Sequence, residues 1–409
     1  MTSIGGNQGG FFDGDNHYYE PLDCFTRHHD GSLPDRQRVH WATSDEGKQR
    51  LMIGDRVARC ISNPTFDPIA RPGGLTAMFG ALHRGAQPTL DGDAALDPLL
   101  PDSPFICRAS RLGQMDRQGV QSIVILPTLA LTVEDYMLHD AKMTAANLHA
   151  FNQWLLEDWG FDHEGRIFGV PLISLLDVDL AVQELTWVLD HGAKVIHIRS
   201  APVNRRSPAD PQFDRFWSII NESGTGVALH ACNVAYARSA EWGEDPDTPA
   251  FFLSPFQHAT VAGYQPVYET IASMVFSNLF GRFPNLRVAS IEQGSSWVDL
   301  AFTQLDKAYH LGRRHRVELP ALPTEIIRQH VFLSPFPEED VAHYVELLGP
   351  GHVMMGSDWP HAEGLAEPRE YLSALAGLDD GVIDEVTRAS AARFVGVGET
   401  VKEARCPST

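Results

Sequence analysis

Cysteine is scarce in this sequence and is never arranged as a C-x-x-C pair. The cysteines are odd in number and widely separated: Cys24, Cys60, Cys107, Cys232 and Cys406. A thiolate zinc site needs closely spaced pairs, and a disulfide framework usually needs an even number, so we expect neither. Unpaired cysteines favour a reducing compartment, and the predicted location is the cytoplasm.

The chain also lacks long apolar runs and an excess of basic residues. No window approaches 18 consecutive apolar residues, so we expect no membrane span. The 53 acidic residues outnumber the 32 lysines and arginines, which gives a formal net charge of −21. This charge repels phosphate backbones and anionic lipids, so neither nucleic acid nor a membrane is an expected partner.

Hydrophobic residues make up 43% of the 409 residues, which is enough to bury a large core. We expect a single domain over residues 11–398. Residues 1–10 are rich in glycine and have no basic segment before an apolar one, which predicts a flexible N-terminal tail and not a signal peptide. Residues 399–409 are expected to form a C-terminal tail.

Short apolar runs alternate with helical patterns along this domain, which is typical of βα units around a parallel sheet. The predicted strands are eight in number, as in an α/β barrel. They are expected at residues 11–15, 122–126, 167–173, 194–198, 226–229, 286–291, 331–333 and 352–355. Amphipathic patterns predict helices at 141–159 and 179–189, the second with Asp177 as its N-cap and Gly192 after its end.

About a hundred residues separate the first two predicted strands, which is too many for an ordinary loop. We interpret the stretch from Pro21 to Ile106, about residues 22–106, as a cap inserted after the first strand. Within it, residues 39–42 and 50–53 predict a hairpin. The tryptophan, phenylalanine, leucine and isoleucine content of this stretch argues against disorder.

Side chains that can bind a metal stand at the ends of three of these strands, where α/β barrels place their active sites. Asp15 and His17 are two residues apart and therefore face the same way on extended backbone. His230 directly follows the strand at 226–229, and Asp358 follows the strand at 352–355. Each residue alone is equally explained by a surface loop or a satisfied core histidine. Together they predict one site, because the first and eighth strands of a closed barrel are neighbours.

Imidazole and carboxylate ligands without thiolates suit Zn²⁺, Mn²⁺, Fe²⁺ or Co²⁺. We therefore expect one divalent metal ion. Zn²⁺ is the first expectation, with Mn²⁺, Fe²⁺ and Co²⁺ as alternatives.

Four motifs follow one another along the chain: DNHYYEP, VALHACN, FPNLRVASIEQGSSW and MMGSDWPHAEG. In this order they resemble the amidohydrolase-2 family of metal-dependent hydrolases, in the branch that is similar to aminocarboxymuconate semialdehyde decarboxylase. The resemblance extends from about Phe11 to Val395. It implies a distorted (β/α)₈ TIM barrel with one divalent metal, held by Asp15, His17, His230 and Asp358.

The sequence departs from the family pattern at two positions. Asp15 stands where many relatives have histidine or glutamate, and Glu292 stands where decarboxylases of the group usually have a histidine. A carboxylate at position 292 could ligate the metal, act as an acid or base, orient another ligand, or be structural.

The predicted catalytic residues are Asp358 and Glu292. A divalent cation lowers the pKa of bound water from about 16 to about 7, and Asp358 would accept a proton from that water and pass it to the leaving group. In the alternative reaction the metal holds a substrate carboxylate, and Asp358 or Glu292 protonates the carbon that loses carbon dioxide. Because the group's histidine is missing, we favour hydrolysis of a small aromatic or carboxylated substrate over decarboxylation. A barrel that binds a ligand without catalysis is a third hypothesis, against which His230 and Asp358 argue.

Two further residues are predicted to bind substrate. Arg199 ends the strand at 194–198 and could clamp a carboxylate, although an ion pair to a neighbouring loop is an equal alternative. His361, three residues after Asp358, is expected to line the pocket. Aromatic residues between Cys232 and Gln265 favour either an apolar small-molecule substrate or a subunit interface. Since relatives often form dimers or tetramers, we expect a homodimer or homotetramer.

Overall fold

The computed structural model describes residues 10–59, 63–75, 96–231, 238–246, 248, 253–261, 264–312 and 318–398. The predicted tails, apart from Gly10, lie outside these residues, as do Cys60, Cys232 and Cys406. Cys24 and Cys107 are free thiols. None of the helices in the described ranges is long and apolar enough to cross a bilayer.

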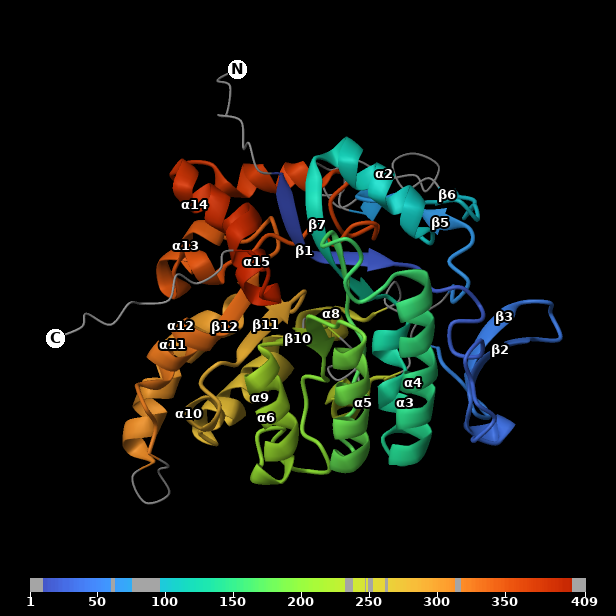
Figure 1. Ribbon diagram of the computed structural model, residues 1–409, viewed down its shortest axis with the longest axis horizontal. Coiled ribbons are helices and arrows are strands. Elements are labelled where there is room, and N and C mark those ends of the chain that lie inside the picture. The colour runs from blue at the N-terminus through green and yellow to red at the C-terminus, as the bar shows by residue number, and fades with distance from the viewer. Residues whose placement is uncertain are drawn as a thin grey trace.

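Two parallel sheets form the centre of the molecule (Figure 1). One has the order β1-β7-β8, and the other has the order β12-β11-β10-β9. Every neighbouring pair in them is parallel, which confirms the α/β class. The strands are β1 (Phe11–Tyr18), β7 (Val120–Pro127), β8 (Ile167–Gly169), β9 (Val195–His197), β10 (Gly226–His230), β11 (Arg287–Ile291) and β12 (Val331–Ser334).

Single parallel bridges link the segments between these sheets. They join Leu172 to His197, Leu333 to Val353, and Asn16 to Trp359. Continuous ladders are not formed at these three places, so closure of an eight-stranded barrel stays a prediction.

Two of the predicted strands differ from the structure. Residues 352–355 do not form a strand: a 3₁₀ helix covers Pro350–His352, and the Met355 N–H bonds to the carbonyl of Val386 instead of to a neighbouring strand. The strand expected at 167–173 ends at Gly169, since Pro171 has no N–H to continue a ladder.

Helices connect the strands and lie outside the sheets, with α4 contacting α5, α5 contacting α6, and α9 contacting α11 (Figure 1). The predicted N-cap Asp177 is confirmed, because its side chain accepts backbone hydrogen bonds at the start of α5, and Asp140 caps α4 in the same way. The α-helices are α2 (Arg108–Gln118), α3 (Glu134–Met137), α4 (Ala141–Asp158), α5 (Val178–Asp190), α6 (Asp214–Ser223), α8 (Pro255–Val261), α9 (Tyr264–Phe276), α10 (Leu279–Arg282), α11 (Ser296–Leu311), α12 (Pro323–His330), α13 (Val341–Leu348), α14 (Asp380–Asp384) and α15 (Ser390–Val395). Other short 3₁₀ or π turns cover Asp35–Gln37, Ala130–Thr132, Pro211–Phe213, Ala240–Trp242, Pro368–Leu375 and Glu385–Ala389.

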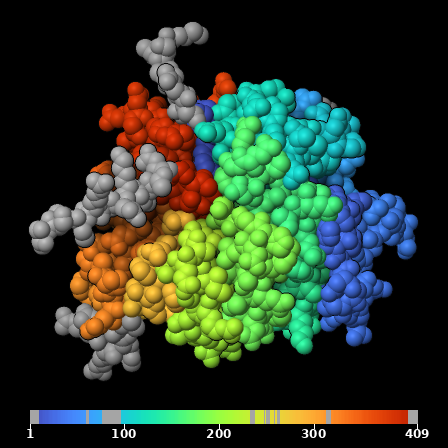
Figure 2. Space-filling view, viewed as in Figure 1, coloured from blue at the N-terminus to red at the C-terminus, as the bar shows by residue number. Residues whose placement is uncertain are grey.

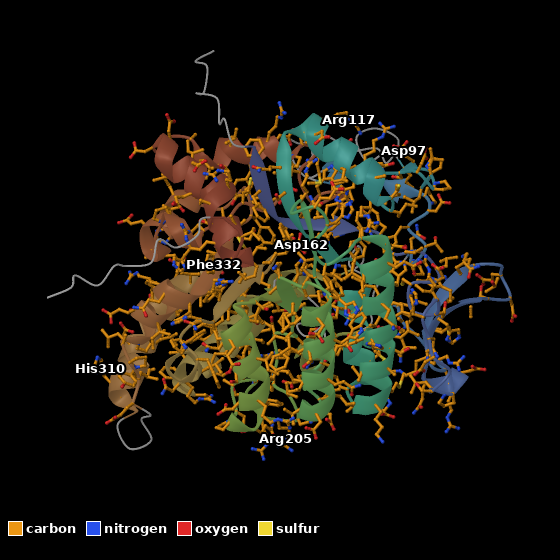
Figure 3. The ribbon with its side chains drawn as sticks, in the orientation of Figure 1. Asp97, Arg117, Asp162, Arg205, His310 and Phe332 are labelled. Carbon is orange, nitrogen blue, oxygen red and sulfur yellow. The ribbon has the colours of Figure 1, made fainter. Side chains whose placement is uncertain are left out.

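The buried apolar residues form two clusters that follow the alternation of the strands. Ile123 and Ile125 of β7 belong to the larger cluster, which includes residues of the surrounding helices. Val124 and Leu126, on the other face of β7, join a smaller cluster to which every strand of both sheets contributes, with Phe332 among its members. Both sheets therefore share one interior core. Figure 3 shows Phe332 further in than Arg117 and His310, which are exposed.

The chain between β1 and β7 forms structure that is separate from the two sheets. It contains β2 (Val39–Thr43), β3 (Gln49–Ile53) and β4 (Arg56–Val57), together with the pair β5 (Ile69–Ala70) and β6 (Leu96–Asp97). The predicted hairpin is confirmed, with β2 antiparallel to β3. It projects beside α4 and forms the blue lobe at the edge of the space-filling view (Figures 1 and 2). The Asn147 side chain of α4 fixes its base by bonding to the Val39 N–H and the Gln37 carbonyl. Whether this insertion caps the site stays a prediction.

Candidate metal centre

Four side chains bring their ligand atoms within 4.8 Å of one another: Asp15, His17, His230 and Glu292. Asp15 and His17 lie within β1, which extends to Tyr18 and is longer than predicted. His230 is the last residue of β10, and Glu292 directly follows β11. The predicted ligands Asp15, His17 and His230 therefore lie together, and Glu292 is the fourth member of the group.

The two histidines present their Nε2 atoms to carboxylate oxygens. The His17 Nε2 atom lies 3.2 Å from Asp15 Oδ1, and the His230 Nε2 atom lies 2.9 Å from Glu292 Oε2 and 3.5 Å from Asp15 Oδ1. The Nδ1 atom of each ring faces a backbone carbonyl: that of Pro127 for His17 and that of Ala231 for His230. Since a carbonyl only accepts, Nδ1 carries the hydrogen in both rings, and each Nε2 is free to bind a cation.

Burial and charge act differently on the four groups. Burial lowers the pKa of His17 to about 4, so this ring is neutral. Burial also lowers the pKa of His230, but the Glu292 and Asp15 carboxylates outweigh this and raise it well above its usual value. For Asp15 and Glu292, burial raises the pKa and the histidines outweigh burial, so both carboxyls stay ionised.

These residues fit a divalent cation. The buried Asp15 and partly exposed Glu292 carboxylates face two imidazole nitrogens, and the His230 Nε2 atom makes no well-aligned hydrogen bond despite its short contact. Each contact between an imidazole nitrogen and a carboxylate oxygen needs a positive charge between them, which either a proton on the ring or a bound cation supplies. Two imidazoles and two carboxylates are a donor set for Mn²⁺ or Zn²⁺.

Asp358 lies beside this cluster, in a second group with His17 and His361. Its Oδ1 atom is 3.5 Å from His17 Nε2 and 2.5 Å from His361 Nδ1. The His361 ring stacks on the His17 ring with centroids 4.2 Å apart. Asp358 therefore contacts the cluster through His17. It was the fourth predicted ligand, but the fourth member of the cluster is Glu292.

The Asp358–His361 pair must hold a proton. The Thr128 hydroxyl donates to the Tyr18 carbonyl and so accepts from His361 Nε2, which uses one ring hydrogen. The 2.5 Å contact between His361 Nδ1 and Asp358 Oδ1 then needs a hydrogen of its own. Burial lowers the pKa of His361, but the Asp358 carboxylate outweighs it and raises this pKa to about 10. Burial raises the pKa of Asp358, which also favours a proton on the pair.

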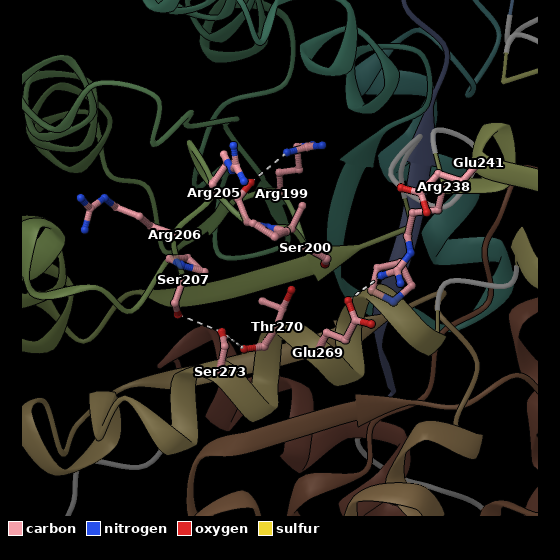
Figure 4. A pocket seen from close by; sticks show the side chains of 14 residues that line it. Arg199, Ser200, Arg205, Arg206, Ser207, Arg238, Glu241, Glu269, Thr270 and Ser273 are labelled. Atoms are coloured by element: carbon pink, nitrogen blue, oxygen red, sulfur yellow. Dashed lines mark hydrogen bonds and ion pairs between the residues drawn. The ribbon is translucent and has the colours of Figure 1, made fainter. Parts of the chain in front are cut away.

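Arg199 lies away from the metal cluster. Its guanidinium forms an ion pair of 2.7 Å with Asp135, and both side chains are largely buried. Arg199 also lines a cavity of about 480 Å³ between the loop that follows β9 and helix α9 (Figure 4). Figure 4 shows Arg205, Arg206 and Arg238 around the same cavity, and Arg238 is paired with Glu269. A role of Arg199 in binding substrate stays a prediction.

Several buried polar residues that support the site were not predicted from the sequence. Asp13 stands two residues before Asp15, and a third acid in the Asp13-Asp15-His17 alternation was an available signal. Arg111 and Glu20 gave no local signal, because most of their partners lie in distant segments. Arg111 donates to the His17 carbonyl, and Glu20 accepts from the N–H groups of residues 128–130.

Comparisons with known proteins identify the family of this chain. A family model described as amidohydrolase matches residues 102–397. The 2-amino-3-carboxymuconate-6-semialdehyde decarboxylase of Dictyostelium discoideum is 25% identical over 57% of this chain and 62% of its own length. The chain thus matches less than two thirds of that relative.

Solved structures extend the likeness over nearly the whole chain. An amidohydrolase of Mycobacterium avium subsp. paratuberculosis K-10 has a TM-score of 0.85 and 36% identity, with 95% of this chain and 99% of that chain covered. A 5-carboxyvanillate decarboxylase from Sphingomonas paucimobilis has a TM-score of 0.61 and 17% identity over 95% and 99% of the two chains. A second one, from Novosphingobium aromaticivorans and complexed with manganese, has a TM-score of 0.56 and 14% identity over 96% and 98%. With the family model matching well over half of its residues, this chain belongs to the amidohydrolase family.

Proposed function

We propose that the protein is a metal-dependent decarboxylase of a small aromatic or conjugated carboxylic acid, on a distorted (β/α)₈ barrel closed by the bridges at Leu172, Leu333 and Asn16. The single observation that carries this proposal is the 2.5 Å contact between His361 Nδ1 and Asp358 Oδ1 next to the metal cluster, from which we infer a proton on the pair. Decarboxylation needs an acid that delivers a proton to carbon, whereas hydrolysis needs a base that removes one from water. The names of the relatives, three of them decarboxylases of aromatic acids or related compounds, support the same reaction.

This proposal reverses the preference for hydrolysis that the sequence suggested. That preference rested on Glu292, which replaces a histidine of related decarboxylases. Glu292 lies among the ligand atoms of the cluster, 2.9 Å from His230 Nε2. A metal-binding role for Glu292 leaves the acid to Asp358 and His361, so the replacement removes no proton donor.

Asp15, His17, His230 and Glu292 would hold the metal. When bound there, a divalent cation would bind the substrate carboxylate and a neighbouring oxygen and draw negative charge away from the ring. We propose Mn²⁺ ahead of Zn²⁺, because carboxylate-rich sites suit Mn²⁺ and a structural relative was solved with manganese.

The Asp358–His361 pair would deliver the proton. The bond between the substrate carbon and its carboxylate breaks, and the electron pair of that bond stays on carbon and takes the proton. Carbon dioxide leaves, and a C–H bond remains. The His17 ring, stacked on His361, and the Thr128 hydroxyl keep the pair in place. The pair then regains a proton from solvent.

A direct assay tests the reaction. Chelator-treated protein is reloaded with Mn²⁺ and incubated with a panel of hydroxybenzoates and conjugated diacids, and released carbon dioxide is measured. We expect release with at least one acid at enzymatic rates, and release from the Asp358→Asn variant that is slower by about 10²–10⁴-fold. Hydrolysis of esters, lactones or amides without any release of carbon dioxide would instead establish the hydrolase, which remains the second candidate.

Metal analysis tests the third hypothesis, a binding protein without catalysis. Less than one metal ion per four chains after expression with added metal would favour it. The predicted homodimer or homotetramer and the cytoplasmic location stay predictions, and mass measurement in solution tests the first.

A further inference from the structure

Asp13 is a fully buried carboxylate that lies within β1 and outside the metal cluster. It accepts four hydrogen bonds. Its Oδ1 atom accepts from the backbone N–H groups of Asp15, at 3.2 Å, and Ser357, at 2.9 Å. Its Oδ2 atom accepts from the Asn16 amide, at 2.9 Å, and the Ser357 hydroxyl, at 2.5 Å. A buried carboxylate with this many donors is well satisfied and geometrically fixed.

The donors belong to the two segments that carry Asp15 and Asp358. One donor is the Asp15 backbone itself, and Ser357 directly precedes Asp358. The Asp358 N–H also bonds to the Asp15 carbonyl, and the His17 N–H bonds to the Trp359 carbonyl. No continuous ladder joins these segments, where the structure has one isolated bridge. The Asp13 carboxylate therefore adds its two hydrogen bonds from Ser357 to the backbone hydrogen bonds that link these segments.

A buried cation completes this arrangement. Arg111 is 1% exposed and donates to the Asn16 side chain and to the carbonyls of His17 and Pro104. Its guanidinium lies 4.5 Å from the centre of the Trp359 ring. Asn16 thus connects the Asp13 carboxylate to a cation that is held under the same two segments.

We propose that Asp13 is a positioning residue that fixes Asp15, and through Ser357 also Asp358, so that the metal site is formed before the ion arrives. This inference rests on the metal site proposed above. Residues that orient metal ligands typically contribute about 10- to 100-fold to metal affinity without touching the ion.

The experiment measures metal affinity and not turnover. Mn²⁺ is titrated into chelator-treated full-length protein by calorimetry, for wild type and for Asp13→Asn. The asparagine keeps the size of the side chain, but its amide hydrogens would face the Asn16 amide, which is also a donor. We expect the dissociation constant for Mn²⁺ to rise 10- to 100-fold, with one site per chain retained and the far-ultraviolet circular dichroism of the apo protein unchanged.

Asp306→Asn is the matched control. Asp306 accepts hydrogen bonds from both the N–H and the hydroxyl of Thr324, just as Asp13 does from Ser357. It differs in position, because it lies on α11 about 15 Å along the helix from Ser296, the residue at which that helix begins. We expect this variant to lose stability without any change in the affinity for Mn²⁺.

Ser357→Ala keeps the test decisive if Asp13→Asn fails to fold. It removes only the hydroxyl donor and should weaken Mn²⁺ binding in the same direction by a smaller factor. Wild-type affinity in a folded Asp13→Asn variant, or in Ser357→Ala when the former does not fold, would overturn the inference. A wild-type protein that binds no Mn²⁺ would instead overturn the proposed metal site.

Discussion

Glu292 and Asp358 adopt nearly the same left-handed backbone conformation, with φ angles of 52° and 53°. Glutamate seldom adopts this conformation, and aspartate adopts it more often. The conformation costs about 1–3 kcal/mol, and it persists only where the surrounding structure imposes it. Glu292 directly follows β11, Asp358 directly precedes the bridge residue Trp359, and both direct a carboxylate towards His17 Nε2. We infer that the strain is retained for the geometry of the site.

Glu292→Asn should separate stability from metal binding. Asparagine tolerates the left-handed region, so we expect the apo protein to become more stable by about 1 kcal/mol, measured by urea unfolding in the presence of chelator. The shorter side chain cannot reach the ion, so the affinity for Mn²⁺ should fall at least tenfold. Glu164→Asn is the control, because Glu164 has a φ of 57° and an exposed side chain. It should gain similar stability with unchanged affinity. Unaltered Mn²⁺ binding in Glu292→Asn would show that Glu292 is not a ligand.

Asp358→Asn should remove the reaction and keep the metal. The amide cannot carry the shared proton, so we expect kcat for decarboxylation to fall by about 10²–10⁴-fold. Because Asp358 lies outside the four-atom group, metal per chain should stay near the wild-type value in mass spectrometric analysis. Loss of the metal together with the activity would restore Asp358 to the ligand set that the sequence predicted.

Chelation should abolish activity, and added Mn²⁺ should restore it. His17→Ala and His230→Ala should show neither stoichiometric metal nor restored activity, because each removes a buried imidazole that no neighbouring side chain replaces. His343→Ala serves as the control, since its ring pairs with Asp299 in a half-exposed contact on the surface. Full activity of the chelated wild-type protein would refute the metal requirement.

Arg199→Met should destabilise the protein through its ion pair. The substitution leaves the Asp135 carboxylate buried without its partner, which costs about 3–5 kcal/mol. The double variant Arg199→Met, Asp135→Leu should recover most of this loss in urea unfolding. A rise in KM that persists in the stable double variant would support the predicted contact of Arg199 with substrate, and an unchanged KM would leave it a structural role.

Glu20 should make stability depend on pH. Burial raises its pKa from the ordinary value of 4.5 to about 7, although three backbone N–H groups favour the ionised form. A carboxyl whose pKa is higher in the folded state contributes stability that is present below pH 4.5 and is lost as the pH rises to 7. Relative to Glu20→Gln, which cannot ionise, the wild-type protein should lose up to about 3 kcal/mol across this range. Parallel stability curves for the two proteins would contradict the raised pKa.

The sequence predicted those parts of the fold that depend on local patterns. The N-cap Asp177 and the β2–β3 hairpin follow from side chains and turns within a few residues, and the structure has them. The segment at 352–355 has the apolar content of a strand, yet its Met355 N–H bonds to Val386. That competing acceptor is distant in sequence and leaves no local signal.

The metal site was predictable as a set of residue types at strand ends, and less so in its details. The residue types at strand ends indicated His17 and His230. The position of Glu292 within the cluster depends on its positive φ angle, which the sequence pattern does not predict. The sequence allowed two partners for Arg199, a substrate carboxylate or an acidic residue of a neighbouring loop. The fold identifies Asp135 as its ion-pair partner. The role of Asp13 was not predicted, because its hydrogen-bond donors include Ser357, which is 344 residues away.

That separation has a consequence for biosynthesis. At about 5–20 residues per second, the ribosome adds Ser357 roughly 20–70 s after Asp13. In the later part of this interval, once His230 has been added, the nascent chain contains the carboxylate and both histidines, but it still lacks the Ser357 donors that fix the first strand against the last segment. Stable capture of the ion is therefore expected only once translation has passed Ser357, which makes metal loading one of the final events in the maturation of this enzyme.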